Sequence, residues 1–90
     1  MRRRSEAALS RTRRLLMYTR ADCGLCHEMR EQLEPWSSRP DVEFAQVDIS
    51  GDASLQKRFG LRIPVLFLDG DELCFGRLDA DLLREALGSR

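Results

Sequence analysis

The chain has 90 residues, a formal net charge of zero, 42% hydrophobic residues and 33% charged residues. This size and composition are typical of one small globular domain, and no apolar run approaches the ~18–20 residues that a membrane span requires. The charge is uneven, with +6 over residues 1–20 and −6 over residues 21–90. Because the basic residues gather on the N-terminal segment and not on a predicted folded face, nucleic-acid binding is not favoured.

Residues 1–13 are predicted to be a basic, flexible extension, and residues 14–90 the folded domain. The extension is rich in Arg and Ser, as transit peptides are, but it lacks the ~7–15 apolar residues of a secretory signal. The chain has three cysteines, and this odd number argues against a secreted disulfide framework. We therefore expect a cytoplasmic protein in a reducing compartment.

The first predicted elements are a strand and a helix. Leu15–Tyr18 is a short apolar run that fits a buried strand. Asp22 is the expected N-cap of the following helix, and Pro35 marks its end. Apolar residues recur after Asp22 at the spacing of one helix face: Leu25, Cys26, Met29, Leu33 and Trp36.

The middle of the chain predicts a second strand and a second helix. Val42–Ile49 is rich in β-formers and alternates in polarity, which indicates a strand. Asp52 is the expected N-cap of a brief helix, in which Leu55 and Phe59 lie four residues apart. Gly60 is the natural stop of this helix.

A hairpin and a last helix complete the order. Val65–Leu68 reads as a central strand, and Asp69-Gly70 is a strong turn signal, so Glu72–Phe75 should pair back on it. Asp79 is the expected N-cap of the last helix and Gly88 its end. The predicted buried stripe of this helix is Leu82, Leu83, Ala86 and Leu87.

This order predicts an α/β fold. A right-handed crossover makes the first two strands parallel, and the hairpin adds two antiparallel strands. The predicted architecture is β-α-β-α-β-β-α, a four-stranded mixed sheet with helices on both faces.

The chemistry of the chain is expected at Cys23-Gly24-Leu25-Cys26, where the first strand ends and the first helix begins. Free N–H groups and the macrodipole at a helix N-terminus favour an anion, so the Cys23 thiol should have a lowered pKa. Arg20 adds positive potential, and His27 is a further electrostatic modulator. Cys26 lies one turn further on the apolar stripe, so its side chain should be more buried than that of Cys23. Cys23 is therefore the predicted nucleophile and Cys26 the resolving thiol.

The stretches YTRADCGLC and IPVLFLDG together resemble the thioredoxin superfamily, and most of all its small glutaredoxin-like branch, over roughly residues 14–88. The resemblance implies a thioredoxin-like fold and thiol–disulfide oxidoreductase activity. It also implies a cis-proline at Pro64 beside the cysteine pair, with the backbone of Ile63 pairing with the substrate. By the same resemblance, Arg62 and Asp79 are candidate contacts for glutathione, with a solvated Arg62 and a helix-capping Asp79 as the alternatives.

The chain departs from the family pattern between its cysteines and before its proline. Gly24-Leu25 stands where glutaredoxins have Pro-Tyr, and Arg62-Ile63 stands where they have Thr-Val. Glutathione is therefore an open candidate co-substrate, and no bound cofactor is expected. The expected partners are a thiol or disulfide substrate, protein or small molecule, and glutathione or a thioredoxin-type reductase. We expect a monomer.

Three alternatives remain open. Cys23-Gly24-Leu25-Cys26-His27 matches the haem-attachment motif, with Met17 or Met29 as the second axial ligand. The same cysteines, with His27 or Cys74, are potential zinc ligands, and glutaredoxin-like proteins are also known to bridge iron–sulfur clusters. The third alternative is a non-catalytic thioredoxin-fold binding module. Cys74 by itself fits a small buried hydrophobe.

Overall fold

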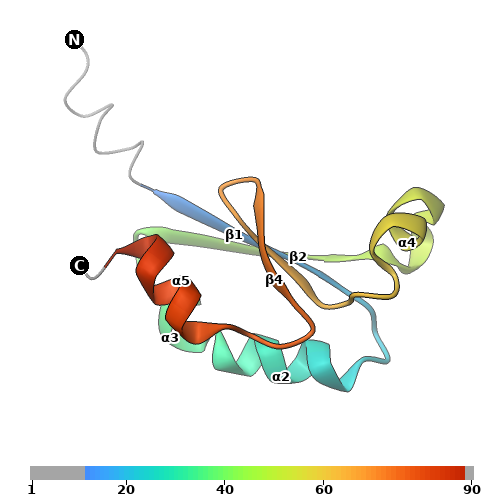
Figure 1. The fold of residues 1–90 in the computed structure, drawn as a ribbon, viewed down its shortest axis with the longest axis horizontal. Coiled ribbons are helices and arrows are strands. Elements are labelled where there is room, and N and C mark those ends of the chain that lie inside the picture. The colour runs from blue at the N-terminus through green and yellow to red at the C-terminus, as the bar shows by residue number, and fades with distance from the viewer. Residues whose placement is uncertain (1–11, 89–90) are drawn as a thin grey trace, which may run out of the picture.

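The structure is a computed structural model that describes residues 12–88 (Figure 1). Most of the predicted N-terminal extension lies outside the described residues. The elements are β1 (Arg13–Thr19), α2 (Gly24–Gln32), α3 (Glu34–Ser37), β2 (Val42–Asp48), the 3₁₀ turn η1 (Ile49–Gly51), α4 (Ala53–Phe59), β3 (Val65–Leu68), β4 (Asp71–Phe75) and α5 (Ala80–Leu87). Within residues 12–88, no helix is long and apolar enough to cross a membrane.

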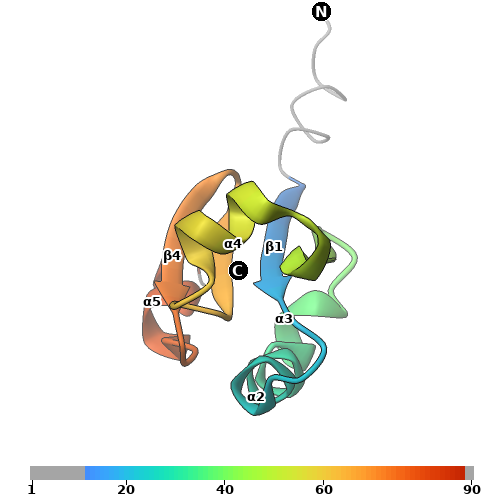
Figure 2. The ribbon, with the colours of Figure 1, turned by 90° about the vertical axis from the view of Figure 1, so that its right-hand side faces the viewer.

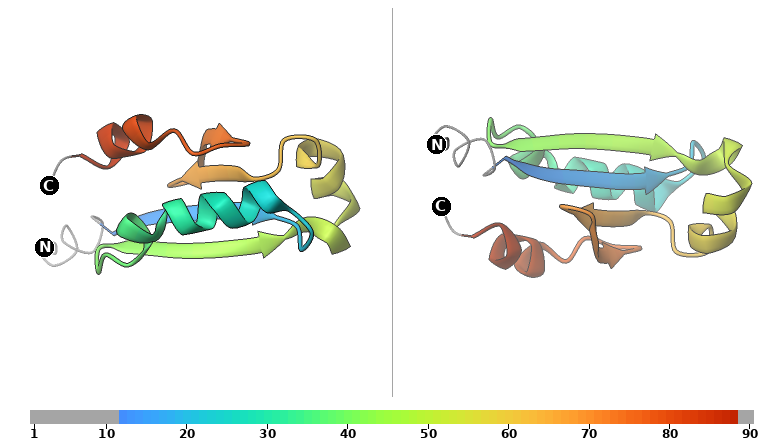
Figure 3. Two further views of the ribbon diagram at one scale, coloured as in Figure 1. Left: turned by 90° about the horizontal axis from the view of Figure 1, so that it is seen from below. Right: turned by 90° about the horizontal axis from the view of Figure 1, so that it is seen from above.

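The four strands form one mixed sheet in the order β2-β1-β3-β4. β1 runs parallel to β2 and antiparallel to β3, and β3 pairs antiparallel with β4, which confirms the predicted topology. Thr19 lies in register with Asp48, and Tyr18 with Val65. The ends of β1 and β2 and the start of β3 therefore meet at one edge of the sheet (Figure 3).

The helices cover the two faces of the sheet unequally. α2, α3 and α5 lie along one side, whereas α4 lies at the edge where β2 ends and β3 begins (Figures 1 and 2). The Tyr18 ring packs 5.1 Å from the rings of both Phe59, on α4, and Phe67, on β3. Tyr18 therefore faces the α4 side of the sheet. Because successive strand residues point to opposite faces, Met17, which is 0% exposed, faces the α2 side.

The core gathers on the α2 side of the sheet. On α2 the buried stripe is Cys26 and Met29, and it continues at Leu33. Leu25 and Leu82, which were predicted to be buried, are 36% and 39% exposed. Each precedes a buried helical residue by one position, and neighbouring helical residues do not share a face. The buried hydrophobic residues are Leu15, Met17, Cys26, Met29, Leu33, Val42, Ile49, Phe59, Ile63, Val65, Leu66, Leu68, Leu83 and Leu87.

The first predicted helix is two helices in the structure. α2 ends at Gln32, Leu33 is its C-cap, and α3 begins at Glu34 with Pro35 in its first turn. Proline has no N–H to donate to the preceding turn, so it interrupts the interior of a helix but is tolerated in a first turn. Pro35 therefore starts a new helix, where the sequence predicted that it ends the first one.

The predicted Asp69-Gly70 turn is confirmed, and it also ties β3 to β1. Asp69 has a φ of 52° and Gly70 a φ of 91°, the left-handed geometry that tight hairpin turns require. The Asp69 carboxylate accepts hydrogen bonds from Arg14 N at 2.9 Å and Arg13 Nε at 2.6 Å. Partial burial opposes the charge, but these donors outweigh it and hold the pKa of Asp69 below its ordinary value.

We predict that Asp69→Asn lowers the free energy of unfolding by about 0.5–1 kcal/mol at pH 7, because it removes the charge that Arg13 contacts at a half-exposed site. Asparagine tolerates the left-handed backbone, so the turn is kept. The folded-state pKa is lowered, so this stability is present above the unfolded pKa of about 4 and is lost as the pH falls through the folded value. Urea unfolding at pH 7 and pH 3 measures the free energy of unfolding, with Asp71→Asn as the control. An equal effect of Asp69→Asn at both pH values would contradict a charge-based origin.

Candidate active site

The sulfur of Cys23 is the N-cap of α2. Cys23 has extended backbone angles, and its Sγ accepts a hydrogen bond from Cys26 N at 3.1 Å. The prediction that Asp22 caps this helix is therefore wrong by one residue. A capping side chain usually bonds the N–H two or three positions ahead, and from Cys23 that N–H belongs to Cys26. The first turn of α2 thus directs a backbone donor at the Cys23 sulfur.

Cys23 and Cys26 form a disulfide, with their Cα atoms 5.2 Å apart. This spacing lies in the range that a disulfide requires. Cys26 is 3% exposed and belongs to the core, whereas Cys23 is only partly buried. The predicted difference in accessibility between the two sulfurs is therefore present.

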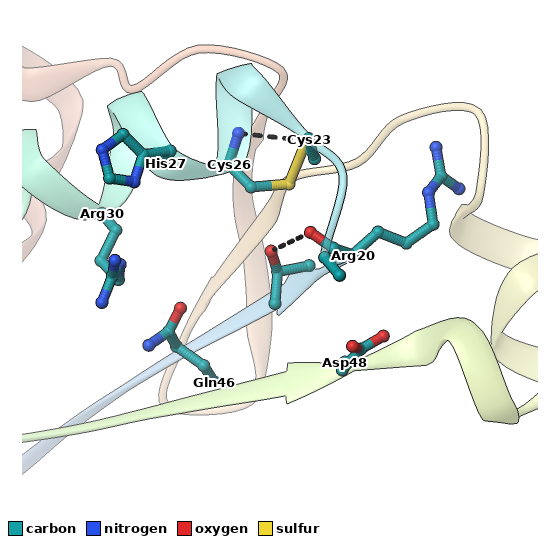
Figure 4. Close-up of a pocket in the computed structure, with 9 residues that line it drawn as sticks. Arg20, Cys23, Cys26, His27, Arg30, Gln46 and Asp48 are labelled. Carbon is teal, nitrogen blue, oxygen red and sulfur yellow. Dashed lines mark hydrogen bonds between the residues drawn. A yellow bond between two sulfur atoms is a disulfide. The ribbon is translucent and has the colours of Figure 1, made fainter.

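A cavity of about 220 Å³ opens beside the disulfide (Figure 4). Its walls come from the end of β1, the first two turns of α2 and the end of β2. It brings together four residues that the sequence singled out, Arg20, Cys23, Cys26 and His27. The full lining is Thr19, Arg20, Ala21, Cys23, Cys26, His27, Arg30, Gln46 and Asp48.

The two predicted electrostatic modulators have partners of their own. Arg20 Nη1 donates to Gly60 O at 3.2 Å, which anchors its guanidinium between the cavity and the end of α4. His27 Nε2 lies 3.1 Å from Glu31 Oε2, one helical turn further along α2. Both side chains line the cavity beside the disulfide, and their influence on the Cys23 thiol stays a prediction.

The sequence analysis did not identify three polar residues of the cavity, Arg30, Gln46 and Asp48. Arg30 lies seven residues after Cys23, which is the spacing of one helix face. The parallel register of β1 with β2 brings Gln46 and Asp48 alongside the cysteine loop. The Asp48 carboxylate accepts a hydrogen bond from Ser50 N at 2.8 Å, and the hydrogen bonds from Ser50 hold the pKa of Asp48 below its ordinary value.

The Ile63–Pro64 peptide bond is cis, as the resemblance implied. Val65 pairs with Tyr18, so Pro64 lies at the sheet edge from which the cysteine loop departs. Pro64 is fully buried, Ile63 is 8% exposed, and neither lines the cavity. Their contact with a substrate therefore stays a prediction.

The two candidate glutathione contacts both have partners within the chain. The Arg62 guanidinium forms an ion pair with Glu72 and lies 5.3 Å from the centre of the Phe59 ring and 5.2 Å from that of Phe75. Asp79 Oδ1 accepts a hydrogen bond from Leu82 N at 3.0 Å, which confirms the predicted cap of α5. A role of either residue in glutathione binding stays a prediction.

The described residues do not bring together three protein ligands for a zinc ion. Across residues 12–88, no three His, Cys, Asp or Glu side chains are grouped to hold a metal ion. Met17 and Met29, the candidate haem ligands, are 0% and 1% exposed within the core. Cys74 is half-buried on β4, and burial raises the pKa of its thiol.

The chain belongs to the family described as the Glutaredoxin-like domain (DUF836), whose model matches residues 14–88. It is 34% identical over 83 residues to "Uncharacterized protein Rv0508" of Mycobacterium tuberculosis, a match that covers 81% of this chain and 86% of that protein. The fold and the spacing of the cysteine pair are therefore those of a small glutaredoxin-like member of the thioredoxin superfamily.

Solved structures agree with this assignment. The solution structure of protein Ne2328 from Nitrosomonas europaea has 33% identity and a TM-score of 0.75, and covers 86% of this chain and 93% of its own. The X-ray structure of protein XcR50 from X. campestris has 38% identity and a TM-score of 0.68, and the match covers 84% of this chain and 97% of that protein. A thioredoxin from Halobacterium salinarum has 24% identity and a TM-score of 0.63, covers 93% of this chain and 79% of its own, and shares the fold.

We predict that the reduced Cys23 thiol titrates below the ~8.5 of a free cysteine, because the N–H of Cys26 and the start of α2 stabilise its thiolate. The measurement is the rate of iodoacetamide alkylation against pH, followed by mass spectrometry of the Cys23 peptide. Cys74 is the internal control and should react only at higher pH, since its thiol is half-buried. A Cys23 value at or above that of a free thiol would contradict the helix-terminus explanation.

Proposed function

We propose that this chain is a thiol–disulfide oxidoreductase of a reducing compartment such as the cytoplasm. The observation that carries the proposal is the position of the Cys23 sulfur. It is partly exposed, it receives a backbone N–H bond at the start of α2, and it lies within bonding reach of the buried Cys26. An accessible thiolate with a second thiol behind it is the arrangement that dithiol exchange requires.

The reaction proceeds in two displacements that start from the dithiol form. The Cys23 thiolate attacks one sulfur of a substrate disulfide, which forms a mixed disulfide and releases the first substrate thiolate. The Cys26 thiol then loses its proton and attacks the Cys23 sulfur, which forms the Cys23–Cys26 disulfide and releases the second substrate thiolate. Two electrons pass to the substrate, and its two thiolates take up from solvent the two protons that the Cys23 and Cys26 thiols have lost.

The cycle closes when an external thiol reductant returns the disulfide to the dithiol. Two molecules of glutathione, or the dithiol of a thioredoxin-type reductase, supply the two electrons and two protons that this step needs. The partial exposure of Cys23 supports attack at this sulfur, since the reductant must reach it. Cys26 is 3% exposed and is the leaving thiol of that step.

We predict that Cys23→Ser abolishes the reduction of a small disulfide and that Cys26→Ser accumulates mixed disulfides. The first variant lacks the nucleophile, and the second lacks the thiol that resolves the intermediate. The measurements are disulfide reduction with dithiothreitol as the electron donor, and mass spectrometry of the trapped adducts. Cys74→Ser is the matched control and should retain wild-type rates. Full turnover by the Cys23→Ser variant would contradict the proposal, and full turnover by Cys26→Ser with glutathione would replace the dithiol mechanism by a monothiol one.

A further inference from the structure

We propose that the cavity beside the disulfide binds a carboxylate side chain of a peptide substrate, with Arg30 as the residue that selects it. This inference rests on the proposed function, because it assigns the substrate class of the same site. It concerns the cavity between α2 and β2, and Pro64 is not among its lining residues. The substrate is thus a polypeptide disulfide with an acidic residue near the reacting cysteine.

The charge of the cavity is opposite to that of the domain around it. Residues 12–88 carry ten basic and fourteen acidic residues, a net charge of −4. The cavity, in contrast, is lined by two arginines against the single carboxylate of Asp48. A local positive site on a negative domain directs an anionic group to that site and repels it elsewhere.

Among residues 12–88, Arg30 has no partner for its charge, unlike the other arginine of the cavity. Its guanidinium forms no ion pair or hydrogen bond with any described residue, and neither does the amide of Gln46, which lines the opposite, β2 wall (Figure 4). Arg20, by comparison, is anchored on Gly60 O. Arg30 and Gln46 together offer N–H donors to one carboxylate, and Arg binds carboxylates with two parallel bonds.

The carboxylates of the neighbourhood do not neutralise Arg30. Asp48 bonds to Ser50 N, where it caps η1. Glu31 pairs with His27, and Glu28 lies 3.7 Å from Arg77. These three carboxylates therefore have partners of their own, and Arg30 stays available to an incoming anion.

The spacing along α2 sets where the substrate's acid must lie. Cys23, His27 and Arg30 occupy positions i, i+4 and i+7 of one helix face, so the Arg30 backbone lies about 10 Å along the axis from Cys23. An extended peptide advances about 3.3 Å per residue. A Glu three positions from the substrate cysteine therefore spans the distance from the Cys23 sulfur to Arg30.

The test uses reduced full-length protein and symmetrical peptide homodisulfides with Glu, Gln or Lys three positions before and after a single cysteine. Each exchange rate constant at low ionic strength is divided by that of dithiothreitol with the same peptide, which removes the intrinsic effect of charge on the peptide thiol. The expected wild-type preference is roughly two- to fivefold for Glu over Gln, as for an exposed ion pair. The preference should shrink as salt is added.

Charge reversal at two arginines separates recognition from a general effect of charge. Arg30→Glu should reverse the order, so that the Lys peptide reacts fastest. Arg84→Glu, the same change on α5 where Arg84 pairs with Asp81, should keep the wild-type preference. An unchanged peptide order in Arg30→Glu would overturn the inference.

The remaining outcomes distinguish this inference from the proposed function. Exchange with all three peptides at one normalised rate would overturn the inference and leave the proposed function standing. Exchange with none of them would contradict the proposed function and the inference with it. Glutathione disulfide is assayed in parallel. An Arg30→Glu effect confined to glutathione disulfide would overturn the assignment of the cavity to a polypeptide substrate.

Discussion

The bond from the Cys26 N–H to the Cys23 sulfur is the interaction on which the proposed chemistry of this protein depends. The same sulfur caps α2 and forms the more exposed half of the disulfide, so the atom that completes the helix is also the proposed nucleophile. In the reduced protein we expect this donor and the helix N-terminus to favour the thiolate over the thiol. In the proposed function, the start of the helix stabilises the negative charge that thiol–disulfide exchange needs at its nucleophile.

The rest of the fold holds that helix start at one edge of the sheet. Met29 and Leu33 bury one face of α2 in the core, and Cys26 shares this face, which keeps the second sulfur inside while Cys23 reaches the surface. The pairing of β1 with β2 and β3 brings Asp48 and Val65 to the same edge as the cysteine loop. The cavity beside the disulfide lies at this edge, and its walls are the ends of β1 and β2 and the first two turns of α2.

The sequence predicted the architecture well because its signals are local. Asp52, Asp79 and the Asp69-Gly70 turn each act within a few residues, and the structure confirms all three. The prediction failed where two adjacent residues suited the same position. Cys23 and not Asp22 is the N-cap of α2. Leu25 and Leu82 are exposed, and the residue after each of them is buried. The cysteine pair was identifiable from its spacing. The cavity could not be predicted, because only the register of β1 with β2 brings Gln46 and Asp48 close to α2. Without that β2 wall, the sequence shows Arg30 only as an ordinary exposed helical residue.

The central claim is that Cys23 and Cys26 exchange reversibly between dithiol and disulfide, and an equilibrium titration against glutathione redox buffers tests it most directly. The reduced fraction of the pair, read by alkylation and mass spectrometry, should follow a single two-electron transition between about −270 and −120 mV, the range of C-x-x-C oxidoreductases. The same spectra show whether glutathione adds to Cys23. A pair that stays reduced, or stays oxidised, across the whole range would contradict the account.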